Sequence, residues 1–115
     1  MSMTLPIIRK DLLTANIDGG KFVSKVEIQE IVMNVGVNAP VHLHPCPTVG
    51  IVTEGIIIFE IEGEQSQYLK VGDAFFEPSD VRVAKFNNNG DIPAKFVAFY
   101  LLGENDKETV RILKE

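Results

Sequence analysis

The sequence predicts a single all-β domain in which short antiparallel strands form a sandwich or barrel. Three observations support this class. Apolar and polar residues alternate over short runs, as in Ile56–Glu62. Residues that favour turns recur about every 8–12 positions. No stretch has the apolar spacing of a long amphipathic helix.

The size and charge of the chain limit its partners. At 115 residues it fits one domain, and its net charge of −5 argues against nucleic acid or an anionic membrane as a partner. No apolar run reaches the length of a membrane span, and residues 1–6 do not have the form of a signal peptide. Cys46 is the only cysteine, so we expect a cytoplasmic protein without internal disulfides.

The N-terminal part is predicted to be extended and then to turn. Residues 5–17 form a short extended segment, which Asp18-Gly19-Gly20 ends as a hairpin turn. Phe22–Val35 is predicted as one long strand with a change of phase. A bulge or bend would be needed there, because the apolar residues occupy different faces: Val26 and Ile28 on one, and Ile31, Met33 and Val35 on the other.

The strands that follow are separated by Gly, Pro, Asn and Asp. In Ile56–Glu62 the residues Ile57, Phe59 and Ile61 share the predicted buried face. Ala94–Leu102 is apolar on both faces, which is typical of a central strand or of one covered by another subunit. For the tail, residues 103–115, we favour an edge strand over a short helix. The further predicted strands are the histidine segment 40–50 with its continuation Val49–Val52, Gln67–Lys70, Ala74–Glu77 and Val81–Phe86.

The two histidines of the chain, His42 and His44, are one residue apart. Alternate residues of a strand point to the same face, so both imidazoles should project together. Two imidazoles on one strand can begin a metal site.

These residues resemble the cupin superfamily, and its first motif is nearly complete. That motif is a glycine, five residues, His-x-His, three or four residues, a glutamate, six residues and a glycine. Gly36, His42, His44 and Gly55 have this spacing. Thr48 stands where the family has glutamate.

The second motif of the family is also present in part. Gly72, Pro78 and Asn87 occupy their expected places, whereas Asp80 replaces a glycine and Val83 replaces the ligand histidine. A slip of one residue in the turn would put Arg82 at the histidine position instead. The short spacer between the motifs is similar to that of small single-domain cupins.

The resemblance implies a conical double-stranded β-helix, a jelly-roll-like barrel of two antiparallel sheets, spanning residues 1–115 as one domain. The motif-bearing core covers about residues 22–102, with residues 1–21 and 103–115 as edge strands or dimer contacts. It also implies a homodimer with a site inside the barrel. In metal-binding cupins the four motif positions supply three histidines and a carboxylate to a divalent transition metal. Here His42 and His44 remain, and Thr48 and Val83 replace the other two ligands.

Three other residues could take part in the site. Glu77 is the best spare carboxylate, either as a substitute metal ligand or general base, or as a solvated strand end, which we favour. Cys46 is expected to be a partly buried residue at a turn, because the prolines beside it break strand geometry. Lys85 either points into the barrel, where it would repel a metal, or points to solvent.

The sequence therefore leaves three functional hypotheses. The favoured one is a protein that binds a small polar or acidic ligand in its barrel, lined by His42, His44, Thr48 and Val83, with an incomplete metal site. The alternative is a metal-dependent dioxygenase, decarboxylase or isomerase that uses His42, His44 and a substitute ligand. The third is a structural or regulatory accessory subunit without chemistry.

Overall fold

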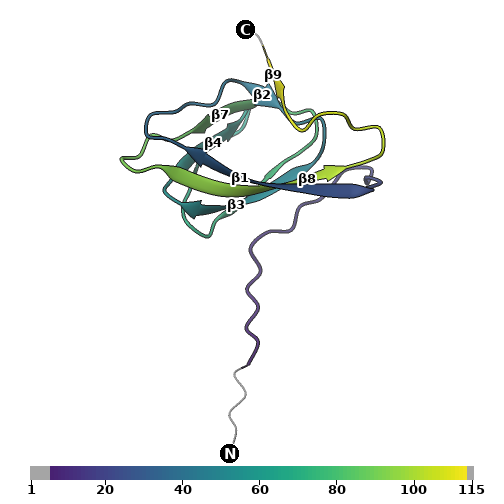
Figure 1. Cartoon of the computed structure of the whole chain (residues 1–115), viewed down its shortest axis with the longest axis horizontal. Coiled ribbons are helices and arrows are strands. Elements are labelled where there is room, and N and C mark those ends of the chain that lie inside the picture. Colours follow the sequence, from purple (N-terminus) through teal and green to yellow (C-terminus); the bar gives the residue numbers. More distant parts are fainter. Residues whose placement is uncertain (1–5, 114–115) are drawn as a thin grey trace, which may run out of the picture.

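The computed structural model describes residues 6–113, which form two facing antiparallel sheets (Figure 1). No helix occurs among these residues, so none there is long and apolar enough to cross a membrane. The predicted all-β class with two antiparallel sheets is confirmed. The strands are β1 (Lys25–Met33), β2 (His42–Leu43), β3 (Thr48–Glu54), β4 (Ile57–Ile61), β5 (Gln67–Leu69), β6 (Ala74–Glu77), β7 (Val83–Asn87), β8 (Ala94–Leu102) and β9 (Arg111–Ile112).

The first sheet has the strand order β1-β8-β3-β6, and the second has the order β5-β4-β7-β2-β9. The two sheets lie against each other without joining edge to edge into a closed barrel. The histidine segment, predicted as one strand, is divided between them. β2 carries His42 in the second sheet, and β3 begins at Thr48 in the first. The prolines at 45 and 47 explain the break, because proline cannot donate to a strand ladder.

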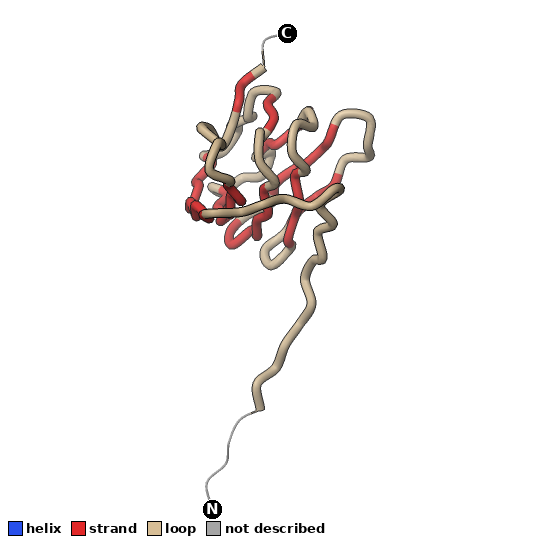
Figure 2. The backbone as a smooth tube through the Cα atoms, turned by 90° about the vertical axis from the view of Figure 1, so that its right-hand side faces the viewer, coloured by secondary structure: helices blue, strands red, loops and turns tan. Residues whose placement is uncertain are grey.

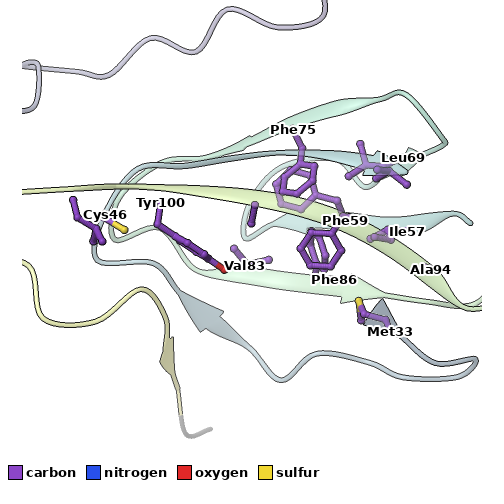
Figure 3. Packing of buried hydrophobic residues seen from close by; sticks show 14 residues of the cluster. Met33, Cys46, Ile57, Phe59, Leu69, Phe75, Val83, Phe86, Ala94 and Tyr100 are labelled. Carbon is purple, nitrogen blue, oxygen red and sulfur yellow. The ribbon is translucent and has the colours of Figure 1, made fainter. Parts of the chain in front are cut away.

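An aromatic cluster fills one end of the space between the sheets. Phe59, Phe75, Phe86 and Phe96 are buried, and neighbouring rings lie 4.9–5.9 Å apart between centroids (Figure 3). Gly50 makes this packing possible. A Cβ at Gly50 would lie 2.8 Å from the backbone oxygen of Val97 and would overlap the ring of Phe75.

The bulge predicted in the first long strand is wrong. β1 pairs with β8 in unbroken register from Lys25 opposite Leu102 to Met33 opposite Ala94. Its apolar residues divide between the faces instead. Met33 is buried, whereas Val26 and Ile28 lie on the outer face and are 48% and 61% exposed. The apparent change of phase therefore marks an apolar outer face.

A bulge does occur in β7, and it decides where Lys85 points. Glu60 pairs with Lys85 and Ile61 pairs with Val83, so Ala84 is the extra residue. Val83 is thus buried, while Lys85 is exposed beside Glu60. Asp80, which stands at the glycine position of the motif, has a φ of 64° and takes the conformation that glycine would take there.

The two ends of the described chain differ in whether they join a sheet. Residues 6–24, called the N-terminal arm below, form no strand, and the turn at Asp18 does not close a hairpin (Figures 1 and 2). The tail instead crosses back to the second sheet, where β9 pairs with β2 as an edge strand. Residues 1–5 and 114–115 lie outside the described residues. The predictions for the first residues of the chain and for the end of the tail fall partly on them.

Candidate metal centre

His42 and His44 meet at the end of β2, between the two sheets. Their rings lie 5.1 Å apart between centroids and are nearly perpendicular, at 83°. Both side chains are buried, at 7% and 6% exposure. The expectation that the two imidazoles project together is therefore met, although His44 lies just beyond the strand.

Backbone carbonyl oxygens hold both rings by the same nitrogen. His42 Nδ1 lies 2.8 Å from the oxygen of Pro40, and His44 Nδ1 lies 2.6 Å from the oxygen of Thr109. A carbonyl oxygen can only accept a hydrogen bond, so each Nδ1 must donate one. In the neutral imidazole this leaves the lone pair on Nε2, which is the tautomer that a metal ligand needs.

Glu77, at the end of β6, completes the group. Its side chain is buried at 2% exposure, so the expectation of a solvated strand end is wrong. The Oε2 atom contacts His44 Nε2, yet it has no hydrogen-bond partner among the described residues. A buried carboxylate oxygen without a donor is costly, so this contact calls for a proton held between Glu77 and His44 or for a bound cation.

Thr48 and Val83, which stand at the two replaced ligand positions, lie opposite the remaining candidate ligands. Both are buried at 1% exposure, as expected for residues that face inward. Thr48 lies directly opposite Glu77 in the β3–β6 pair, so the carboxylate missing at position 48 is supplied from the neighbouring strand. Val83 lies directly opposite His42 in the β2–β7 pair and offers no donor.

The burial of the site changes the acidity of two groups. Burial lowers the pKa of His44, but the close carboxylate of Glu77 and the carbonyl of Thr109 outweigh burial, so the pKa lies above its ordinary value. Burial, with the charge of Glu77, raises the pKa of Tyr100 to about 12. Tyr100 therefore keeps its hydroxyl proton at neutral pH.

A cavity of about 360 Å³ opens beside these groups. His42, His44, Glu77 and Tyr100 line one part of it, and three rings of the aromatic cluster, Phe75, Phe86 and Phe96, line another. Two residues of the tail, Val110 and Ile112, also line it, so the C-terminal segment is part of the cavity wall. The ring of Tyr100 is tilted against that of His44 at 5.7 Å, and Figure 3 shows Tyr100 pointing between the sheets.

The three residues fit a metal ion. Ligand atoms of His42, His44 and Glu77 all lie within 4.8 Å of one another, and zinc sites have metal–ligand distances of about 2.0–2.2 Å. The three groups are therefore close enough to be considered as ligands of a single ion. Two imidazoles and one carboxylate form the facial set that leaves positions open for a substrate. The Glu77 oxygen without a hydrogen-bond donor is the observation that an ion would explain.

Two groups of the site, the Thr109 carbonyl and Tyr100, were not identified as site groups from the sequence. The Thr109 carbonyl carries no sequence signal, because any residue could supply it. Tyr100 was detectable, since it shares the inward phase of Phe96 on β8. Cys46 is fully buried rather than partly buried, and its thiol is not part of the ligand group found among the described residues.

Solved structures with the same fold include enzymes. The DMSP lyase DddQ from Ruegeria pomeroyi DSS-3 is 22% identical to this chain, with a TM-score of 0.65. The match covers 76% of this chain and 42% of the lyase chain. An oxalate oxidase in complex with the substrate analogue glycolate is 24% identical, with a TM-score of 0.60. The match covers 66% of this chain and 41% of the oxidase chain. A cupin-like protein from Thermotoga maritima MSB8 is 19% identical, with a TM-score of 0.64. The match covers 76% of this chain and 64% of the Thermotoga chain.

This chain thus spans less than two thirds of the length of each of these proteins, and at such identities the likeness concerns the fold. No curated protein matches the sequence. The family model of the cupin domain, however, matches residues 29–100, which include the histidine pair, Glu77 and Tyr100. With two partly matching motifs, two facing sheets and a cavity between them, the chain belongs to the cupin family.

Proposed function

We propose that this protein binds a divalent transition metal ion through His42, His44 and Glu77 and acts as a metal-dependent enzyme on a small molecule in the cavity. The carrying observation is the pair of atoms His44 Nε2 and Glu77 Oε2. They are in contact, while the Nδ1 atom of His44 is already committed to the Thr109 carbonyl. The proposal replaces the favoured hypothesis of an incomplete site with its metalloenzyme alternative.

The residues of the chain would have distinct roles in such a site. The ion would supply a Lewis acid that polarises an oxygen of the substrate. Glu77 would offset part of the charge of the ion, and the two carbonyls would keep the imidazoles in the binding tautomer. Tyr100 would donate a hydrogen bond to the substrate, and the apolar wall would exclude water.

The enzymes among the similar structures support a catalytic role, since one is named a DMSP lyase and another an oxalate oxidase. A cytoplasmic location is also part of the proposal. Cys46 is a free thiol, which fits a reducing compartment.

Metal content tests the proposal directly. Protein produced without an affinity tag should contain a stoichiometric transition metal, or take it up after dialysis against cobalt(II) or zinc(II). His44→Ala and Glu77→Gln should each lower metal affinity by more than about 100-fold, because loss of a direct ligand exceeds the 10–100-fold cost of losing an outer partner. Lys85→Gln is the matched control, since Lys85 is exposed and pairs with Glu60.

The competing explanation predicts a different outcome. If His44 and Glu77 form only an ion pair, Glu77→Gln would destabilise the fold, and the wild type would take up no metal under any of these conditions. That result would overturn the proposed metal centre. Isothermal calorimetry and thermal unfolding of the same samples separate the two outcomes.

We also propose that a second copy of this chain covers the outer face of the first sheet. An apolar row crosses all four strands in register and consists of Ile28, Phe99, Val49 and Phe76. The N-terminal arm adds exposed apolar side chains, among them Ile7 at 78% and Ile8 at 86%. The same chain thus offers an apolar face and an uncovered apolar arm, which a two-fold dimer could bury together.

The oligomeric state tests this second proposal. Sedimentation should give a dimer for the wild type and a monomer for Ile28→Lys, because a charge in the centre of an apolar interface is costly to bury. Gln67→Lys adds the same single charge at an exposed polar position on β5, in the other sheet, and serves as the charge-matched control. A monomeric wild type would contradict the proposal.

A further inference from the structure

The walls of the cavity differ sharply in chemistry. Around the candidate ligands lie a few polar groups, whereas Phe75, Phe86, Phe96 and Met33 form a continuous apolar surface. No lysine or arginine is among the described residues that line the cavity. The cavity therefore has an apolar region, which could hold the body of a ligand, and a small polar region at the candidate metal ligands.

The charge balance at the polar end limits what can bind. This step rests on the proposed metal centre. A divalent ion carries two positive charges, Glu77 contributes one negative charge, and the two histidines are neutral when they are ligands. The excess of one positive charge is neutralised by a ligand with a single negative charge. A dianion would leave a net negative charge in a buried site that has no lysine or arginine to balance it.

The hydroxyl of Tyr100 adds a directional contact at the same end. Tyr100 is buried, lines the cavity and has no hydrogen-bond partner among the described residues. A phenol can donate one hydrogen bond to a nearby acceptor. An oxygen of the ligand would supply the missing partner.

The cavity volume sets the size of the apolar body. At about 360 Å³ it lies near the lower end of the range of 300–1,000 Å³ that is usual for small-molecule sites. The rings of Phe75, Phe86 and Phe96 lie 4.9–5.9 Å from one another in tilted or edge-on arrangements. Such a surface suits a flat or branched apolar group of about one ring in size.

We propose that this site takes compact, largely apolar molecules with one monoanionic oxygen group, and that it discriminates against small dianions. Specificity would come from two separate features. The aromatic wall selects the body of the ligand, and the charge balance at His42, His44 and Glu77 selects its head. A small acidic ligand without an apolar body, which the sequence alone allowed, would lack the contacts with the aromatic wall.

Two matched pairs of probes test these features on protein loaded with cobalt(II). Benzoate and acetate have the same head and differ in the apolar body. Calorimetry and the cobalt absorption spectrum should show benzoate binding about tenfold or more tightly than acetate, since burial of a ring is favourable. Succinate and its monomethyl ester have similar bodies and differ by one charge. The ester should bind about tenfold or more tightly, because the dianion leaves an unbalanced buried charge.

A cavity variant tests where the probes bind. Ala98→Leu adds bulk to the cavity wall on β8 and should reduce benzoate affinity about tenfold with little effect on acetate. Val97→Leu is the matched control, because Val97 lies on the outer face of the same strand. The wild-type probe series decides the proposal even if Ala98→Leu does not fold.

The outcomes separate this inference from the function on which it rests. Failure of the wild type to take up cobalt would overturn the metal centre. Uptake of cobalt with benzoate no tighter than acetate, or with succinate as tight as its ester, would overturn the ligand class and leave the metal centre standing. Loss of benzoate binding in Ala98→Leu together with retention in Val97→Leu would support the assignment of the cavity.

Discussion

The two halves of the candidate metal centre are built differently. Glu77 belongs to a sheet in which β3 and β8 pair over six positions and β3 and β6 pair over four. His42 and His44 belong to a region where β2 and β9 are only two residues long. The carboxylate is therefore positioned by a sheet, and the imidazoles by single hydrogen bonds to backbone carbonyls.

This difference shows how one site can combine a rigid and an adjustable part. The sheet that carries Glu77 is backed by the aromatic cluster, so a change in its packing should affect the stability of the whole fold. The histidine region depends on the C-terminal tail, which supplies the Thr109 carbonyl and pairs with β2. A change in the tail should affect metal binding more than stability.

The largest effect is expected when the rigid half is disturbed at Gly50. Gly50→Ala would place a Cβ against the ring of Phe75 and 2.8 Å from the Val97 oxygen. Overpacking of this kind costs about 1–3 kcal/mol of unfolding free energy, which urea denaturation would measure. Gly90→Ala is the control, since its Cβ would meet only the Asn88 side chain, at 3.3 Å. Equal stability of the two variants would contradict the close packing of Phe75.

An intermediate effect is expected when the adjustable half is disturbed. Arg111→Pro with Ile112→Pro removes both backbone N–H groups of β9 and should weaken its pairing with β2, although Leu113 N still donates to the Val41 oxygen. His44 would lose the fixed position of its acceptor, and metal affinity should fall about 10–100-fold by calorimetry.

The matched double variant Arg111→Ala with Ile112→Ala keeps both backbone donors and is the control for loss of the side chains. Unchanged metal affinity in the proline variant would show that the imidazoles are held without the tail.

The smallest effect is expected at the base of the tail, where Asp106 joins it to the N-terminal arm. The hydrogen bond from Lys21, with that from the backbone of Gly103, lowers the pKa of Asp106 below its usual 3.8. A lowered pKa contributes stability that is fully present above pH 3.8 and is lost as pH falls through the lowered value.

Asp106→Asn should therefore be less stable than the wild type at neutral pH, and the difference should shrink below pH 3.8. Thermal unfolding across this range measures it. Glu104→Gln, which removes the charge of an exposed carboxylate nearby, is the matched control. A difference that grew as the pH fell would contradict the pairing of Lys21 with Asp106.

The sequence by itself determined most of the strands and the candidate residues, although it predicted the histidine segment as one strand. Ala94–Leu102 and Ala74–Glu77 were predicted with the bounds that the structure shows, because alternation and flanking turn residues are local signals. The same holds for the inward positions of His42, His44, Thr48 and Val83, which follow from motif spacing and strand period. The sequence also pointed to Glu77 as a spare carboxylate, but it favoured the wrong environment for it.

Only the tertiary structure decided which of these residues meet. Glu77 enters the site because β6 pairs with β3 at Thr48, a contact between strands that neither segment encodes alone. Lys85 points to solvent because of a bulge at Ala84, which depends on the pairing of β7 with β4. The carbonyl that fixes His44 comes from Thr109, 65 residues along the chain. Strand pairing and backbone acceptors depend on long-range packing, so the metal centre became visible only when the two sheets and the tail were brought together.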